Sequence, residues 1–309
     1  MKVLITGSQG YIGQKLVKAL VPHSHVTGID IVDATSENYD YHKMDIRDPA
    51  LSEFMQQQKF THVVHLASIL QPSDDPRRDY DIDVNGTLNV LGACVKANVN
   101  HLTVTSSGAA YGYHADNPDW LSETDALRGN PHFAYSHHKR LIENMLADCR
   151  TNNPDLQQLI LRPGTVLGAN TNNLITNLFR KKRILAIRGS RSPFVFILDE
   201  DVAEIILQGV QHSKVGIYNL AGDGALSIQD IAAVMNKPLL TLPAGLLQSL
   251  LWIGNKLGIS SYGPEQLDFL RYRPVLSNKA LKEQFGFVPS KTSKQVFEFF
   301  VKSQGLINE

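Results

Sequence analysis

The first thirteen residues constrain the fold of this chain more than any other stretch. Residues 3–5 are a short apolar run that predicts a buried parallel strand, and the apolar period over residues 11–20 predicts a helix. Gly7, Gly10 and Gly13 punctuate the junction in the sequence TGSQGYIG. A strand, a glycine turn and a helix in this order present bare backbone N–H groups at a helix N-terminus, where a diphosphate binds.

The glycines follow a GxxGxxG spacing rather than the GxGxxG of long dinucleotide dehydrogenases. A tight strand-to-helix turn would by itself explain two of the three glycines, so the surrounding residues carry the interpretation. Asp30 ends a second predicted strand, residues 25–29, twenty residues after Gly10. A carboxylate there can accept hydrogen bonds from both ribose hydroxyls of an adenosine. Because it would also repel a 2′-phosphate, the sequence favours NAD over NADP as the cofactor.

The charge balance and the two cysteines limit the class of protein. The 30 basic and 30 acidic residues cancel, which gives no indication of a nucleic-acid partner or an anionic membrane. Cys94 and Cys149 lie at apolar-face positions of predicted helices, which fits a reducing compartment. The chain opens directly into a strand, and its longest apolar stretch, residues 239–253, is interrupted by Pro243. We therefore expect a cytoplasmic protein with no membrane span and no nucleic-acid partner.

The alternation of predicted strands and helices indicates an α/β fold with a doubly wound parallel sheet. Six strands are expected, at residues 3–5, 25–29, 41–46, 61–66, 101–105 and 156–161, with helices at about 49–58, 79–97 and 134–151. Past Pro163 the elements become shorter, and glycine and proline separate them. We expect a Rossmann domain in residues 1–165, to which residues 195–221 return, and a smaller irregular substrate lobe in residues 166–309.

A tyrosine and a lysine are placed for proton transfer. Tyr135 and Lys139 are four residues apart at the start of a predicted helix, so they share one face. A fixed cation beside a phenol, whose ordinary pKa is about 10, stabilises the phenolate and suits it to general acid–base chemistry. Ser107 follows the strand at 101–105, at the sheet edge where open α/β sheets bind ligands. We expect its hydroxyl to bind the same substrate oxygen.

The Tyr-x-x-x-Lys spacing alone is weak, because the chain contains it twice. Tyr39 and Lys43 repeat it in an extended stretch after the second strand, where residues four apart are far from each other. The pair at Tyr135 is favoured because it follows a serine-bearing strand end within the nucleotide-binding pattern.

Eight segments in order resemble the extended short-chain dehydrogenase/reductase family, in its NAD-dependent epimerase/dehydratase branch, which includes nucleotide-sugar epimerases. They are TGSQGYIG, Asp45-Ile46, HLAS from His65, VNGTLNVLGA from Val84, SSGAAYG, YSHHK, LRPGTVLG from Leu161 and DEDVAEII from Asp199. The resemblance covers roughly residues 1 to 220. It implies an NAD-dependent oxidoreductase in which Ser107, Tyr135 and Lys139 are the catalytic trio.

The same resemblance implies roles for residues around the cofactor. Asp45 and Ile46 match the adenine pocket, residues 66–68 match the wall beside the adenosine ribose and diphosphate, and Asn85 matches an asparagine that braces the active-site side. The expected cofactor-binding residues are Gly7, Gly10, Tyr11, Ile12, Gly13, Asp30, Ile31, Asp45, Ile46, Leu66, Ala67, Ser68, Asn85, Tyr135, Lys139 and Pro163.

The chain also departs from the pattern of its resemblance. Nucleotide-sugar dehydratases carry an acid one or two residues after the position of Ser107, where this chain has Gly108 and Ala109, so elimination of water is not expected. Thr165 stands where many sugar enzymes have asparagine, and Leu198 replaces a usual histidine. Both changes weaken the resemblance to enzymes that act on nucleotide sugars.

The second half offers two kinds of substrate contact. Arg188, Arg191 and Arg271 could hold a substrate diphosphate through their planar forks, with Ser107 and Thr165 as further candidate substrate residues. The basic run at 180–183 could do the same, although such a run is most often simply solvated. A predicted helix after Pro243 carries a wide stripe, Leu246, Leu247, Leu250, Leu251 and Trp252. It would pack on the lobe or form a wall or lid over an apolar substrate.

The eleven histidines do not predict a metal site. His62 and His65 lie three apart on a strand and point to opposite faces, and His137 and His138 are adjacent on a helix and cannot converge on one ion.

We expect a nucleotide-sugar 4-epimerase that acts on a small-molecule substrate. An NAD-dependent dehydrogenase or reductase of an apolar, lipid- or steroid-like hydroxyl is the alternative. A non-catalytic NAD-binding redox sensor is a third hypothesis. The complete Ser-Tyr-Lys set argues against it. The resemblance further implies a homodimer through the helices at 79–97 and 134–151, the second of which carries the stripe Leu141, Ile142, Met145, Leu146 and Cys149.

Overall fold

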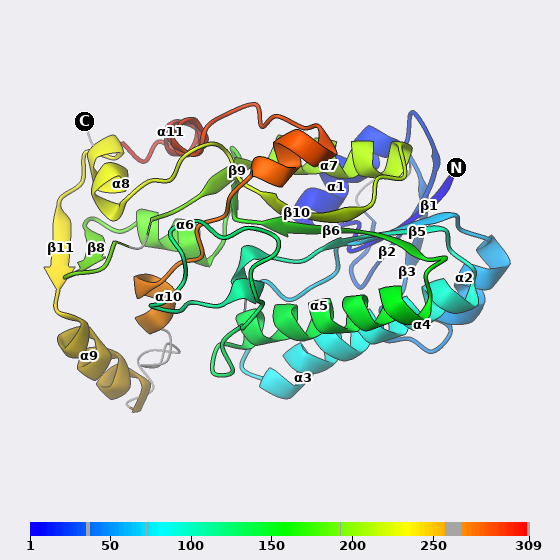
Figure 1. Cartoon of the computed structure of the whole chain (residues 1–309), viewed down its shortest axis with the longest axis horizontal. Coiled ribbons are helices and arrows are strands. Elements are labelled where there is room, and N and C mark those ends of the chain that lie inside the picture. Colours follow the sequence, from blue (N-terminus) through cyan, green and yellow to red (C-terminus); the bar gives the residue numbers. More distant parts are fainter. Residues whose placement is uncertain (35–37, 72, 192, 257–266, 308–309) are drawn as a thin grey trace.

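A seven-stranded parallel sheet forms the centre of the molecule (Figure 1). The computed structural model describes residues 1–34, 38–71, 73–191, 193–256 and 267–307. The strand order is β10-β6-β5-β4-β1-β2-β3. The strands are β1 (Lys2–Thr6), β2 (His25–Asp30), β3 (Asp40–Lys43), β4 (His62–His65), β5 (His101–Thr105), β6 (Gln157–Pro163) and β10 (Gly216–Leu220). The doubly wound parallel fold is confirmed, with β10 as a seventh strand beside β6 and with β3 ending three residues earlier than predicted.

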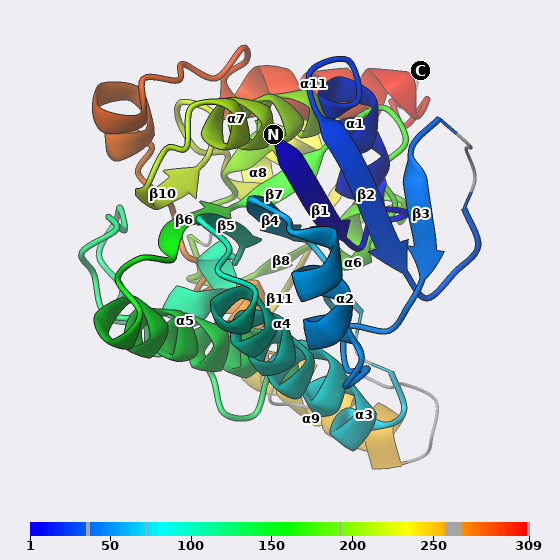
Figure 2. The ribbon, with the colours of Figure 1, turned by 90° about the vertical axis from the view of Figure 1, so that its right-hand side faces the viewer.

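Helices cover both faces of the sheet (Figure 2). The helices α1 (Tyr11–Leu20) and α7 (Asp199–Gln211) lie on one face, and α2 (Leu51–Gln58), α4 (Gly86–Lys96) and α5 (Ala134–Asn152) lie on the other. Side chains alternate across a strand, so Val3 and Ile5 enter the core under α1 and α7 while Leu4 enters the core under α2, α4 and α5. Both faces are buried, which is why the first strand is continuously apolar.

The predicted helix at 79–97 is broken into three parts. It begins earlier, as α3 (Pro76–Tyr80), because Asp75 caps it by accepting from the backbone N–H groups of Arg77 and Arg78, and Pro76 occupies its first turn. A π-helical turn, η1 (Asp81–Asn85), then connects α3 to α4. Such turns accommodate an extra residue in a helix and occur often at functional sites.

The second half builds a lobe beside the carboxyl ends of the strands (Figure 1). Two pairs of parallel strands, β7 (Thr165–Leu167) with β9 (Phe196–Leu198) and β8 (Ile184–Ile187) with β11 (Leu239–Leu242), form small sheets. Phenylalanine rings pack against one another in the lobe core, where Phe196 stacks on Phe297 and Phe179 meets Phe297 edge-on. Its helices are α6 (Leu174–Phe179), α8 (Ile228–Val234), α9 (Ala244–Lys256), α10 (Leu267–Arg271) and α11 (Ser293–Ser303), with a π-helical turn η4 (Leu281–Phe285).

Only part of the predicted apolar stripe on α9 is packed. Leu247 is buried against Ile187 and Leu267, and Leu251 lies at the edge of this small cluster. Leu246, Leu250 and Trp252 are each half exposed. Figure 1 shows α9 at the end of the lobe, beyond β11.

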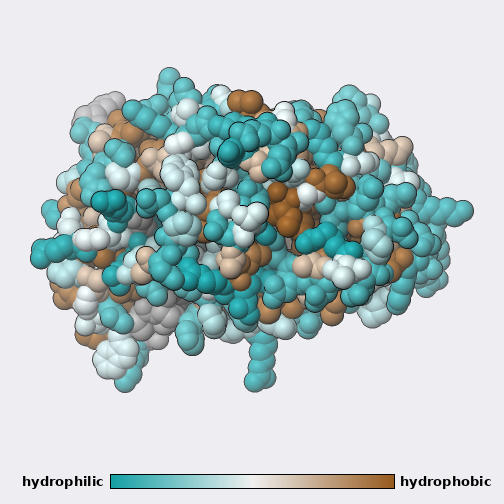
Figure 3. Space-filling view, in the orientation of Figure 1, coloured by the Kyte–Doolittle hydropathy of each residue, from teal (hydrophilic) through white to brown (hydrophobic). Residues whose placement is uncertain are grey.

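The face seen in Figure 3 is mostly hydrophilic, with apolar side chains in separate small patches. Within the described residues, no helix is both long and apolar enough to cross a membrane.

Candidate active site

The glycine turn after β1 leaves no room for side chains. Gly7 has a left-handed φ of 72°, and a Cβ there would lie 2.7 Å from the backbone N of Ala67. A Cβ on Gly13 would lie 2.2 Å from the carbonyl O of Gly7, so α1 presses directly on the turn. Gly10 occupies the N-cap of α1 in extended conformation and brings no capping side chain. The first N–H groups of α1, from Tyr11 and Ile12 onward, therefore point into a cradle suited to an anion.

Asp30 lies beside this turn at the end of β2. Its Oδ2 accepts from the backbone N–H of Gln9 at 2.9 Å, and its Oδ1 accepts from that of Ile31 at 2.7 Å. Each carboxylate oxygen can accept more than one bond, so both remain able to receive ribose hydroxyls. Leu66, Ala67 and Ser68 are half-buried in the loop that follows β4, and Ala67 closes the other side of the turn.

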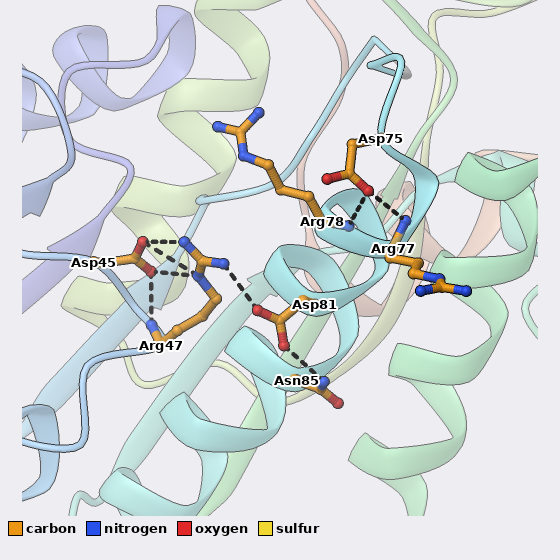
Figure 4. A network of polar contacts seen from close by, with 7 residues as sticks. All are labelled: Asp45, Arg47, Asp75, Arg77, Arg78, Asp81 and Asn85. Atoms are coloured by element: carbon orange, nitrogen blue, oxygen red, sulfur yellow. Dashed lines mark hydrogen bonds and ion pairs between the residues drawn. The ribbon is translucent and has the colours of Figure 1, made fainter.

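The predicted adenine pocket carries an ionic network (Figure 4). Ile46 is buried, and a Cβ on Gly86 would lie 2.6 Å from its Cδ1, so α4 packs closely on it. Arg47 binds Asp45 at 2.6 Å and Asp81 at 2.8 Å, and hydrogen bonding by Arg47 lowers the pKa of Asp45. Asn85, which the resemblance assigned to bracing the active-site side, is exposed and donates to Asp81 at 2.8 Å, so its side chain belongs to this surface network.

The three residues of the expected catalytic trio occupy neighbouring elements. Tyr135 and Lys139 lie on the first turns of α5, and the Lys139 Nζ is 5.6 Å from the centre of the Tyr135 ring. Lys139 is buried and donates to the carbonyl O of Thr105, at the end of β5, at 3.3 Å. The Ser107 Oγ accepts from the N–H of Ala109 at 3.1 Å. This bond uses an oxygen lone pair, so the hydroxyl hydrogen can be donated to a substrate oxygen.

A buried ion pair fixes the loop that carries Ser107. Arg162 on β6 binds Glu143 on α5 through two N–H···O bonds of 2.8 and 2.6 Å, and both side chains are almost fully buried. Ser106 donates to the same carboxylate at 2.6 Å. Ser136, next to Tyr135, donates to the carbonyl O of Ala109 at 2.7 Å. The strand end and the start of α5 are therefore held together from both sides.

The second Tyr-x-x-x-Lys pair does not come together, as predicted. Tyr39 lies beside the glycine turn in contact with Gln9, whereas Lys43 forms an ion pair with Asp33 at 2.9 Å.

The structure brings further residues to the site that the sequence did not indicate. Asp83, on the π-helical turn, binds His138, the residue before Lys139, at 2.9 Å. His138 lies within the YSHHK segment, but the sequence indicated no role for its side chain. An acidic residue at an inward-facing helix position is a usable signal, but the π-helical turn that orients Asp83 breaks the periodicity on which it would be recognised.

An aromatic cluster adjoins the start of α5. Tyr113, Phe133 and Phe269 pack with ring centres 5.2 to 5.5 Å apart, and Phe269 comes from α10 of the second lobe. The Arg273 guanidinium lies 3.8 Å from the centre of the Phe194 ring and 5.4 Å from that of Phe269. These residues are far apart in sequence, so only the fold shows that they meet.

The predicted substrate residues are spread over the lobe. Thr165 is half-buried on β7, and Arg188 and Arg191 are exposed in the segment that follows β8. Arg191 and Arg273 both line a small apolar cavity with Leu178, Phe194 and Ile228. The Arg271 side chain lies over the Tyr272 ring. The basic run at 180–183 is exposed to solvent, as expected for a run of charges that is simply solvated.

In the described part of the chain, no group of three or more potential metal ligands converges. His62 bonds to Ser213, which follows α7, while His65 bonds to Thr6 and to Thr87 of α4. These partners lie on opposite faces of the sheet, as the strand periodicity predicted.

Comparison with known proteins agrees with this architecture. A rice (Oryza sativa subsp. japonica) UDP-glucose 4-epimerase 2 is 27% identical over 257 residues, which cover 74% of this chain and 61% of that protein. The solved UDP-glucose 4-epimerase of Thermus thermophilus, in complex with NAD, has a TM-score of 0.75 and 22% identity and covers 99% of this chain and 100% of its own.

A second solved structure is equally similar in fold. The UDP-glucose 4-epimerase of Thermotoga maritima, with UDP-glucose, has a TM-score of 0.75 and 17% identity and covers 99% of both chains. The model of the NAD-dependent epimerase/dehydratase family matches residues 3–221, which include the glycine turn, the Ser107 loop and the start of α5. By this match, the chain belongs to the NAD-dependent epimerase/dehydratase family.

Proposed function

We propose that this chain is an NAD-dependent nucleotide-sugar 4-epimerase. The observation that carries the proposal is the position of Lys139, which is buried, bound to the end of β5 and packed beside the Tyr135 ring, next to the strand end that presents Ser107. A cation, a phenol and a hydroxyl in this arrangement can move a proton on and off one substrate oxygen. Family membership and the fold shared with UDP-glucose 4-epimerases support the choice of reaction.

The glycine turn and its surroundings fit NAD. A Cβ on Gly7 or Gly13 would collide with backbone, so these glycines keep the turn tight against α1, and Gly10 places no side chain between a diphosphate and the first N–H groups of α1. Asp30 is placed to bind the adenosine ribose hydroxyls and to disfavour a 2′-phosphate, and Ile46 to pack on the adenine. Lys139 would reach the nicotinamide ribose. When bound, NAD supplies the acceptor for the hydride from the substrate carbon and returns the same hydride to the product.

The residues of the chain would handle the proton and the geometry. The Tyr135 phenolate takes the proton of the sugar 4-hydroxyl as the C–H bond breaks, and Lys139 stabilises the phenolate. Ser107 donates a hydrogen bond to the same oxygen, which becomes the carbonyl oxygen of a 4-keto sugar. After the ketone turns over in the pocket, Tyr135 returns the proton to this oxygen on the inverted carbon. Gly108 and Ala109 offer no acid or base, so loss of water does not compete.

The second lobe supports two substrate classes. Arg188 and Arg191 are exposed on the lobe, and their guanidinium groups suit a nucleotide diphosphate. The cluster of Tyr113, Phe133 and Phe269 beside α5 favours an apolar, flat substrate body, as in the alternative of a dehydrogenase for a lipid- or steroid-like alcohol. A redox sensor is disfavoured, because binding NAD does not require a buried lysine beside a tyrosine and a serine.

Cofactor content separates the two enzymes. An epimerase returns its hydride in every cycle and keeps its cofactor, whereas a dehydrogenase exchanges it. We expect protein purified without added cofactor to release close to one NAD or NADH per chain on denaturation, and to interconvert UDP-glucose and UDP-galactose without added NAD. Cofactor-free protein that requires NAD and accumulates NADH with an apolar alcohol would instead establish the dehydrogenase.

A further inference from the structure

The Asp83 carboxylate lies at the junction of three segments. It is on the π-helical turn η1, with 2% of its surface exposed. Its Oδ1 accepts from the Ser68 hydroxyl at 3.0 Å and from the Ile69 N–H at 2.8 Å. Its Oδ2 accepts from the His138 Nδ1 at 2.9 Å. One side chain therefore joins the loop after β4, the helix that follows this loop, and α5.

Both segments bound by Asp83 belong to the candidate active site. Ser68 is in the loop whose Ala67 closes the glycine turn, and His138 directly precedes Lys139 on α5. The π-helical turn makes this possible, because it supplies the extra residue that lets Asp83 leave the regular helical register and face α5. A shift of the loop or of α5 would have to break a buried, charge-assisted bond.

The ionisable groups around Asp83 interact with one another. Burial raises the pKa of Asp83, but the bond from His138, the charge of Lys139 and the bonds from Ile69 and Ser68 outweigh it, so the net pKa is below its ordinary value. The buried Lys139 ammonium thus faces an ionised carboxylate.

Other groups also face His138 and its partners. The Tyr80 ring of α3 meets the His138 ring edge-on at 5.5 Å, and His137 is its neighbour on α5. His65 on β4 faces both Lys139 and Asp83, and burial holds the His65 pKa at about 3, so this ring stays neutral. Asp83 and Lys139 lie within reach of each other's charge, and His138 is bound to the Asp83 carboxylate from α5.

We propose that Asp83 and His138 are positioning residues that hold the Lys139 ammonium beside the Tyr135 phenol and lock α5 to the loop beside the glycine turn. The inference rests on the proposed role of Tyr135 and Lys139 in proton transfer. Asp83 and His138 act through Lys139 and through Ser68, without contacting the substrate.

Two substitutions at one position test the bond itself. His138→Ala removes the donor to Asp83, whereas His138→Asn keeps an N–H donor at nearly the same place as Nδ1 but cannot titrate. His137→Ala is the matched control, since it removes a ring from the same helix and leaves the bond to Asp83 intact. Asp83→Asn removes the charge while keeping the shape, and the double variant Asp83→Asn/His138→Asn restores a neutral pair if the single variants fold poorly.

In His138→Ala we expect kcat to fall between about 10- and 100-fold, as small misplacement of catalytic groups does, while KM and NAD affinity change little. The acid limb of the kcat–pH profile should move up by about one pH unit, because the ammonium no longer lies as close to the phenol. His138→Asn and His137→Ala should keep the kcat and the profile of the unmodified protein. A merely structural role would lower the melting temperature without moving the profile.

A readout without substrate separates this inference from the proposed function. The phenolate absorbance of Tyr135, obtained by subtracting the Tyr135→Phe variant in each background, should appear at higher pH in His138→Ala than in the unmodified protein, because the Lys139 ammonium no longer lies as close to the phenol. Equal absorbance profiles in all backgrounds would overturn the positioning role. If the profiles shift as expected but no background turns over a nucleotide sugar, the proposed substrate fails and the positioning role stands.

Discussion

At the scale of single residues, Tyr135 carries the strongest expectation. Tyr135→Phe removes one hydroxyl and leaves the ring beside Lys139, so the proton acceptor is lost while the packing remains. We expect turnover to fall at least about 100-fold, in the range of general acid–base contributions, with NAD affinity nearly unchanged. Steady-state kinetics and calorimetric titration with NAD measure the two effects, and normal turnover would reject the assignment. Lys139→Ala should impair both, because Lys139 would also bind the nicotinamide ribose.

His65 makes the stability of the fold depend on pH. Burial, together with the charge of Lys139, lowers the pKa of His65 to about 3, whereas the unfolded chain has the ordinary value of about 6.5. Below pH 6.5 the unfolded chain binds a proton that the folded chain does not, so stability contributed by neutral His65 is lost as pH falls from about 6.5 toward 3.

The variant His65→Gln should therefore lose less stability on acidification. Between pH 7 and pH 5, we expect its free energy of unfolding to fall by about 2 kcal/mol less than that of the unmodified protein. Urea unfolding at the two pH values measures this difference. His23→Gln, at an exposed position, is the control and should change nothing. An unaltered pH dependence in His65→Gln would mean that the buried ring is protonated in the folded state.

At the scale of elements, the buried ion pair of Glu143 and Arg162 joins α5 to β6, and Glu143 also binds Ser106 at the end of β5. Glu143→Gln would leave the Arg162 guanidinium buried without its counter-charge, which typically costs about 3–5 kcal/mol of stability. Asp116→Asn, which breaks an exposed ion pair with Arg128, is the matched control and should have little effect. Chemical denaturation of both variants measures the contrast. Equal losses in the two variants would contradict the importance of the buried pair.

The sequence predicted helices and strands best where a single spacing of apolar residues continued without interruption. The strand β1, the glycine turn and α1 follow directly from apolar spacing and backbone sterics, and so does the shared face of Tyr135 and Lys139. The helix expected at 79–97 was wrong in its start and in its continuity, because the Asp75 cap and the π-helical turn depend on contacts with the β4 loop and α5. Arg273 and Phe269 could not be placed, since their partners are distant in sequence.

At the scale of the whole molecule, the homodimer remains a prediction. The surface that could form its interface differs from the one predicted from the sequence. Ile142 and Leu146, predicted to form part of the interface, are buried in the core of the subunit itself. The outer side of the same helical layer instead exposes Leu88 on α4 and Tyr80 on α3. We expect a dimer at micromolar concentration by light scattering and a weaker one in Leu88→Asp. A strictly monomeric mass for the unmodified protein would reject the dimer.

The position of β10 has a consequence for how the protein is made. During synthesis, β6 leaves the ribosome about fifty residues before its neighbour β10, and the intervening chain contains β7, β8, β9 and α7. Until β10 arrives, β6 is an unpaired edge of an otherwise assembled sheet, the kind of edge on which nascent chains misassociate. The nucleotide-binding sheet therefore cannot be completed until residue 220 has been made, and a gene truncated after residue 165 should yield an aggregation-prone fragment rather than a smaller cofactor-binding protein.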